Sequence, residues 1–136
     1  MDITAHIEYQ GNLRTKATHI RSGSELITDA PVDNRGKGEA FSPTDMVAAA
    51  LGTCILTTVG IKAMDAGFSI DGADANVRKI MASDPRRISE IIVEMNFPSR
   101  DYSEKIKTII KNTAKTCPVA KSLHPGLKQT MIFNFL

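Results

Sequence analysis

The sequence is poor in the residues on which several common functions depend. Its 136 residues include only five Phe and two Tyr, and the formal net charge is +2. With so little basic excess and so few rings for stacking on bases, nucleic acid is not an expected partner. The three histidines, His6, His19 and His124, lack metal-ligand spacing with the cysteines. We therefore expect no metal site and no bound cofactor.

Cysteine is also scarce. The only two cysteines are Cys54 and Cys117, and they do not form a Cys-x-x-Cys pair. The first residues alternate polar and apolar side chains and show no basic and then apolar leader, so we expect a cytoplasmic protein. In such a reducing compartment two cysteines do not form a structural disulfide by default.

The most apolar segment predicts a helix at the centre of the fold. Residues 46–61 carry no charge and place apolar side chains on every face of a helix. Ser42 and Asp45 form a capping-box pattern before this run, and Gly67 suits the position after the last helical residue. Because the run is shorter than the ~20 residues that a bilayer crossing needs, we expect a core helix and no membrane span.

Alternating polar and apolar residues predict two groups of strands. The first group lies at residues 3–9, 13–19 and 25–28, with a hairpin turn signal at Gly11-Asn12 and a polar loop over 29–41. The second lies at residues 68–70, 75–82 and 91–97. After it we expect a helix capped by Ser103, a break at Pro118, a short helix through Leu123 and a final strand over 128–136.

This order of elements predicts one α+β domain over residues 1–136, with two antiparallel β-meanders and long central helices. The core helix over residues 46–61 needs cover on all sides. Since few other elements are available, we expect a second copy of the chain to supply part of that cover in a two-fold dimer.

Each cysteine has two interpretations. Cys54 lies on the most apolar helix, where a cysteine is usually a small hydrophobic residue. Cys117 precedes Pro118 at a predicted helix N-terminus, where backbone N–H groups favour a thiolate. A dithiol that cycles through a disulfide is the hypothesis that uses both residues.

A reactive thiol in this chain would need a nearby cation. An unperturbed thiol with a pKa of about 8.5 is only ~3% thiolate at pH 7, and an arginine stays charged when buried. The candidates are Arg14, beside the first hairpin turn, and Arg35, in the polar loop, although each also fits a solvated loop charge. Asp45 or Glu39 would hold such an arginine in orientation, but the capping box alone also explains Asp45.

Two segments together carry a resemblance to a known family. The two segments are Phe41-Ser-Pro-Thr-Asp-Met-Val-Ala-Ala-Ala-Leu-Gly-Thr-Cys54 and Thr116-Cys-Pro-Val-Ala-Lys-Ser-Leu-His-Pro125. They resemble the two cysteine motifs of the OsmC/Ohr family, which comprises the osmotically inducible and organic hydroperoxide resistance proteins. The likeness covers nearly the whole chain. It implies the OsmC-like fold, an intertwined homodimer in which sheets from both chains wrap the long central helices.

The resemblance also implies a thiol-dependent peroxidase. In that family the residue at Cys54 is the peroxidatic thiolate that attacks a small organic hydroperoxide, and the residue at Cys117 resolves the sulfenic acid as a disulfide. A dithiol reductant, with the lipoyl type as one candidate, then reopens the disulfide. The activating arginine corresponds to Arg14, with Arg35 as the competing match.

The sequence departs from the family at the carboxylate. Hydroperoxide resistance members carry a glutamate just after the motif proline, where this chain has Thr44, and the acidic residue is Asp45. The Arg–carboxylate clamp is therefore either rebuilt or absent. His124, in the second motif, is either an acid or base near Cys117 or a hydrogen-bonded surface group. The alternative function is a non-catalytic or slow redox-sensing and binding protein, associated with stress, that keeps the same fold.

Overall fold

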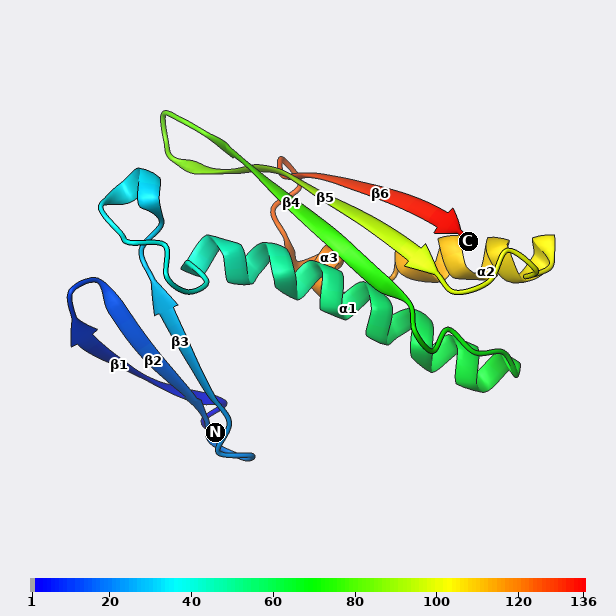
Figure 1. The fold of residues 1–136 in the computed structure, drawn as a ribbon, viewed down its shortest axis with the longest axis horizontal. Helices are drawn as coiled ribbons and strands as arrows, with labels where there is room; N and C mark the ends of the chain where they lie inside the picture. The colour runs from blue at the N-terminus through cyan, green and yellow to red at the C-terminus, as the bar shows by residue number, and fades with distance from the viewer. Residues whose placement is uncertain (1) are drawn as a thin grey trace. The chain divides into compact units, whose positions relative to one another are not determined.

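The computed structural model describes residues 2–136 (Figure 1). The elements in chain order are β1 (Ala5–Gly11), β2 (Arg14–His19), β3 (Glu25–Asp29), the 3₁₀ helix η1 (Val32–Asn34), α1 (Pro43–Ala66), β4 (Asp74–Ala82), β5 (Arg87–Phe97), α2 (Glu104–Ala114), α3 (Pro118–Ser122) and β6 (Lys128–Phe135). They form two compact units, of which the first ends at Val47 and the second spans Ala48–Leu136. The mixture of helices with two sheets confirms the α+β class. The single domain over residues 1–136 stays a prediction.

The first sheet contains β1, β2 and β3 in sequence order, with both pairs antiparallel. Its first hairpin turn lies one residue later than the Gly11-Asn12 signal predicts. Gly11 pairs with Arg14, so the turn residues are Asn12 and Leu13, with φ of 55° and 65°. A bulge between Tyr9 and Gly11 shifts the register and accounts for the displacement.

The second sheet has the order β4-β5-β6 and is mixed, so the prediction of a second antiparallel meander is wrong. β4 and β5 are antiparallel, whereas β6 runs parallel to β5 (Figure 1). The cause is the connection between them, because α2 and α3 carry the chain back to the end at which β5 begins. A parallel pair requires such a crossover. Residues 68–70, which the sequence predicts to be strand, lie in the connection before β4.

The ends of α1 follow the local signals in the sequence. The Asp45 N–H donates to Ser42 Oγ at 3.0 Å, and the Ser42 N–H donates to Asp45 Oδ2 at 3.0 Å, which completes the capping box. At the other end Gly67 has a φ of 81°, and its N–H donates to Ala63 O at 2.9 Å.

One face of α1 lies in the core of the second unit. Its buried side chains recur every three or four residues, and they pack with β5, with α2 and with Cys117; the α1 members are Ala48, Leu51, Ile55 and Val59. Gly52 permits a close approach to β4, because a Cβ at position 52 would lie 2.8 Å from Val77 Cγ2. Each large apolar side chain buried here stabilises the fold by roughly 1.5–3 kcal/mol relative to exposure.

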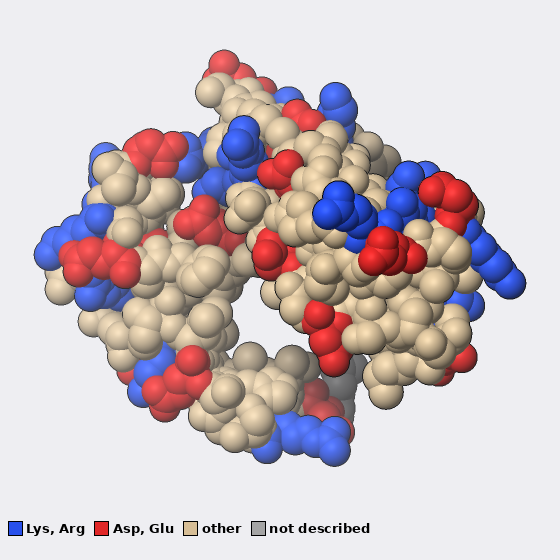
Figure 2. Space-filling model, turned by 45° about the vertical axis from the view of Figure 1, so that its right-hand side comes forward, with Lys and Arg blue, Asp and Glu red and all other residues tan. Residues whose placement is uncertain are grey.

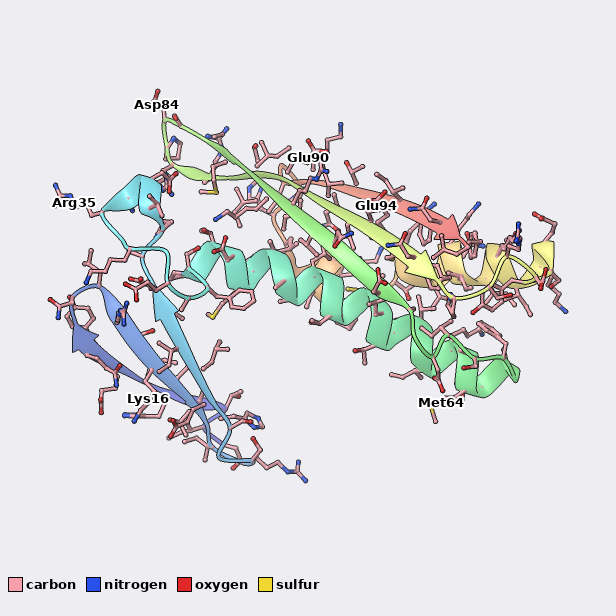
Figure 3. All side chains as sticks on the ribbon, in the orientation of Figure 1. Lys16, Arg35, Met64, Asp84, Glu90 and Glu94 are labelled. Carbon is pink, nitrogen blue, oxygen red and sulfur yellow. The ribbon has the colours of Figure 1, made fainter. Side chains whose placement is uncertain are left out.

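The opposite face of α1 has no such cover within the second unit. Ile61 is 59% exposed and Met64 is 83% exposed, and Figure 3 shows Met64 pointing away from the second sheet. By length and composition α1 is also apolar enough to cross a membrane, with a mean hydropathy of 1.7, a property that core helices share. The buried stripe of α1 agrees with the predicted core helix.

The second helical segment divides as the sequence predicts. Ser103 caps α2, since its Oγ accepts from the Ile106 N–H at 3.2 Å. α2 ends at Ala114, and Pro118 begins α3 because proline disfavours helical conformation in the residue before it. Cys117 is therefore the residue that precedes α3.

Candidate active site

Cys54 lies near the middle of α1 with a partly exposed side chain. Its Sγ is 3.9 Å from the Thr58 hydroxyl, one helical turn further along. A cysteine that serves only as a small hydrophobic residue would be fully enclosed, as its neighbour Ile55 is. The accessibility and the polar neighbour of Cys54 instead suit a reacting thiol.

Cys117 is the N-cap of α3 and is fully buried. Its Sγ accepts from the Ala120 N–H at 3.3 Å, as a capping oxygen would in the same position. The side chain belongs to the same buried cluster as Ile55 and Val59 of α1. α3 thus presents the Cys117 sulfur to the middle of the core helix.

Cys54 packs against the buried cluster that contains Cys117, and the pKa values of the two thiols shift in opposite directions. Burial raises the pKa of Cys54. Three hydrogen-bonding interactions lower it by more, so this pKa lies below its ordinary value. They come from the Cys117 thiol, the Val119 backbone and the Thr58 hydroxyl. Burial raises the pKa of Cys117, and the hydrogen bond to Cys54 raises it further. Cys54 is therefore the sulfur that ionises first, and Cys117 is the thiol that keeps its proton to higher pH.

Arg14 forms ion pairs with two carboxylates of the first unit. Its Nη2 lies 3.1 Å from Glu39 Oε2 and 3.6 Å from Asp29 Oδ2. Glu39 and then Asp29 raise the pKa of the Arg14 guanidinium, so it stays charged. Asp29 is almost fully buried and also accepts from the Glu39 N–H at 3.1 Å. Asp45 and Glu39 were the carboxylates predicted to orient an arginine. In the structure Glu39 forms the ion pair with Arg14.

Asp29 is the residue that the sequence reasoning did not identify. It occupies the last position of β3, directly across from Arg14 in the antiparallel register of β2 and β3. Counting residue pairs outward from the turn between β2 and β3 would have placed Asp29 opposite Arg14. The signal was therefore present, but it required strand pairing rather than a motif.

Asp45, Arg35 and His124 have local roles in the structure. Asp45 closes the capping box of α1. Arg35 follows η1 with a φ of 69°, is exposed, and extends outward from the loop in Figure 3. His124 is exposed, and its Nδ1 accepts from the Gly126 N–H at 2.8 Å. This contact agrees with a hydrogen-bonded surface group, which is one of the two roles proposed for His124 from the sequence.

The predicted site residues are divided between the two units. Arg14, Glu39 and Asp45 belong to the first unit, and Cys54, Cys117 and His124 belong to the second. The structure brings together the two thiols within the second unit, and Arg14 with Glu39 within the first. Among residues 2–136 no group of three or more His, Cys, Asp or Glu side chains is arranged to hold a metal ion.

Comparison with known proteins extends over almost the full chain. The family model for OsmC-like protein matches residues 36–131. A crystal structure of a proposed osmotic stress induced and detoxification response protein from Psychrobacter arcticus 273-4 is 51% identical and has a TM-score of 0.94, with 98% of this chain and 97% of that chain covered. No curated protein matches the chain.

Two more distant structures share the fold. The organic hydroperoxide resistance protein OsmC from Legionella pneumophila is 12% identical with a TM-score of 0.76, and 97% of each chain is covered. OhrB of Bacillus subtilis, an organic hydroperoxide resistance protein, is 16% identical with a TM-score of 0.71, and the coverage is 97% of this chain and 98% of that one. With the family model and the 51% identical relative, these findings show that the chain belongs to the OsmC-like protein family.

Proposed function

We propose that this protein is a thiol-dependent peroxidase that reduces organic hydroperoxides, with Cys54 as the attacking thiolate and Cys117 as the resolving thiol. The observation that carries the proposal is the placement of a partly exposed Cys54 against the buried cluster that contains Cys117, and the opposite pKa shifts of the two thiols agree with it. Relatives of the same fold are named for organic hydroperoxide resistance, which supports the choice of substrate. The proposed reaction uses no cofactor, because the Cys54 sulfur itself donates the two electrons that reduce the hydroperoxide.

In the first step the Cys54 thiolate attacks the terminal oxygen of the hydroperoxide. The S–O bond forms as the O–O bond breaks, so sulfur is oxidised by two electrons and the alkoxide leaves with a proton as an alcohol. Arg14, whose guanidinium Glu39 holds in orientation, stays the candidate cation for this step. Asp45 contributes by starting α1, the helix that carries Cys54.

In the second step Cys117 attacks the Cys54 sulfenic acid. The S–S bond forms as the S–O bond breaks, and the hydroxide leaves as water with the proton of the Cys117 thiol. Because the two side chains already contact each other, the disulfide forms without a large movement. A dithiol then donates two electrons through a mixed disulfide, which restores both thiols and leaves the donor as a disulfide.

The proposal includes a homodimer located in the cytoplasm. The exposed Ile61 and Met64 form part of an apolar face on α1 that a second copy would cover. Light scattering is expected to give a dimer for the wild type and a monomer for Ile61→Glu/Met64→Glu. The exposed Lys62 provides a control, since Lys62→Glu introduces a carboxylate on another side of α1 and removes no apolar side chain.

The direct test is the consumption of cumene hydroperoxide in the presence of dihydrolipoamide. We expect turnover by the wild type and none by Cys54→Ser. Cys117→Ser is expected to complete one oxidation and then stop, with a sulfenic acid at Cys54 that a dimedone-type reagent traps. Equal, very slow consumption by the wild type and Cys54→Ser would refute the peroxidase and favour the redox-sensing alternative.

A further inference from the structure

A groove on the second unit lies between the end of α2, α3 and β6. Its volume is about 530 Å³, and we call it the lysine groove; it is lined by Lys111, Lys115, Ala120, Lys121, Gln129, Met131 and Phe133. The three lysines supply its charge, and Met131 and Phe133 supply an apolar floor.

The charge of the lysine groove is unbalanced. None of its lining residues is acidic, and among residues 2–136 none of the three lysines forms an ion pair. Over the face that Figure 2 draws as a whole, acidic and basic side chains are interspersed. Three like charges repel one another, so their gathering around one groove favours a partner of opposite charge.

The packing of α2 holds part of this charge in place. Lys107, Lys111 and Lys115 are spaced by four residues, so they follow one face of the helix. The Nζ atoms of Lys107 and Lys111 lie 5.3 Å and 6.0 Å from the centre of the Phe135 ring. The ammonium groups of Lys107 and Lys111 therefore lie over the Phe135 ring of β6, and Lys107 also pairs with Glu104 at 3.6 Å.

Ala120 connects the lysine groove with the thiol pair. Its side of α3 lines the groove, and its carbonyl accepts from the Gln129 side chain at 2.9 Å. Its N–H donates to Cys117 Sγ at 3.3 Å. A molecule seated in the groove would thus contact the residue whose backbone supports the resolving sulfur.

We propose that the lysine groove docks an acidic segment of the dithiol protein that reduces the Cys54–Cys117 disulfide; this inference rests on the proposed peroxidase function. The lysines of the groove are exposed and lie on flexible stems. Exposed charges of this kind raise the rate of association with a charged protein more than they raise the affinity for a small ligand. A buried, hydrogen-bonded cation would instead indicate a site for a small anion.

The docked donor supplies both electrons. A donor thiolate attacks the disulfide, one donor–protein S–S bond forms, and one cysteine leaves as a thiolate that takes up a proton. The second donor thiol then breaks the mixed disulfide, so the donor is released oxidised and the protein holds two thiols. Cys54 is the sulfur open to attack because Cys117 is fully buried in the described reduced state.

The test compares two synthetic dithiol probes. Each is a peptide with a dihydrolipoyl group, and one is rich in Glu where the other has Gln. The oxidised wild-type protein should react at least ~10-fold faster with the Glu-rich probe than with the Gln-rich probe. Raising the salt concentration should remove that advantage, since exposed charges are screened beyond about 10 Å at 0.1 M.

Variants of the lysine groove locate the effect. The triple change of Lys111, Lys115 and Lys121 to Gln should abolish the preference for the Glu-rich probe, and the matched triple change to Arg should keep it. Reduction by dithiothreitol should be equal in all three proteins. The same preference in the Gln triple variant and the wild type would overturn the proposal.

A binding measurement separates this inference from the proposed function. A fluorescent Glu-rich peptide without thiols should bind the wild type and the Arg variant more tightly than the Gln variant. If no disulfide forms with hydroperoxide, the peroxidase proposal fails, yet this binding is still measured. If the disulfide forms but the acidic peptide shows no lysine dependence, only the docking proposal fails.

Discussion

Cys54 packs against the buried cluster that contains Cys117, and the interaction between the two thiols lowers the pKa of Cys54 while it raises the pKa of Cys117. The sulfur with the lowered pKa is the partly exposed one, and the sulfur with the raised pKa is buried. A nucleophile needs access and ionisation together, whereas a resolving thiol must remain protonated until the sulfenic acid forms. Exposure and the direction of the pKa shift therefore agree with the two proposed roles.

The Thr58 hydroxyl is expected to assist ionisation of Cys54. In Thr58→Val the thiolate loses one donor, so its pKa rises and less of it is ionised at neutral pH. We expect alkylation of Cys54 by iodoacetamide at pH 7 to slow on the order of threefold, since a hydrogen bond contributes roughly 0.5–1.5 kcal/mol. The pH at which the alkylation rate is half-maximal should move upward.

Thr57→Val is the matched control for this change. Thr57 is exposed on the same helix, and the described contacts of Cys54 do not include it. Its alkylation profile should coincide with that of the wild type. Equal profiles for the Thr58 and Thr57 variants would show that the hydroxyl does not support the thiolate.

Gly52 is expected to be intolerant of a side chain. In Gly52→Ala the new Cβ would lie 2.8 Å from Val77 Cγ2, and the branched Val77 side chain has little freedom to turn away. We expect the free energy of unfolding to fall by roughly 1–3 kcal/mol, as for other overpacked cores. Urea denaturation followed by circular dichroism measures the change.

Gly60 offers the comparison within the same helix. A Cβ at Gly60 would meet only Ile70 Cδ1, at the ordinary contact distance of 3.9 Å. Gly60→Ala should therefore stabilise the protein by up to about 1 kcal/mol through helix propensity. A loss of stability of the same size in both variants would mean that Val77 is not the cause.

Asp29 is expected to be the more important carboxylate of the Arg14 cluster for stability. It is 2% exposed, whereas the Glu39 side chain is 56% exposed. Asp29→Ala leaves the Glu39 N–H without its acceptor and should lower the free energy of unfolding by about 1–3 kcal/mol. Glu39→Gln should change stability much less, because surface ion pairs contribute little. The reverse order in urea denaturation would contradict this ranking.

The capping box is expected to stabilise the start of α1. Ser42→Ala removes the acceptor of the Asp45 N–H and should lower the free energy of unfolding by about 1 kcal/mol. Thr53→Ala, an exposed change within the same helix, should have an effect within about 0.5 kcal/mol. Thermal unfolding of both variants measures the difference, and equal melting temperatures would exclude a stabilising cap.

Short-range features of the fold were predictable because neighbouring residues produce them. The capping box at Ser42, the end of α1 at Gly67 and the break at Pro118 each involve residues within one helical turn. The hairpin turn was displaced by one residue because the bulge after Tyr9 depends on how two strands pair. The parallel placement of β6 was missed for a related reason, since strand direction depends on the path of α2 and α3.

The sequence by itself determined the family and the candidates for chemistry: two motifs typical of one family, two thiols, and a small set of arginines and carboxylates. Only the tertiary structure decided that Asp29 lies beside Arg14 and that Cys54 packs against the cluster that contains Cys117. Caps and turns arise from atoms a few residues apart, so they can be predicted from the order of residues. Ion pairs and thiol contacts join residues remote in the chain, and their geometry is set only when strands pair and helices pack.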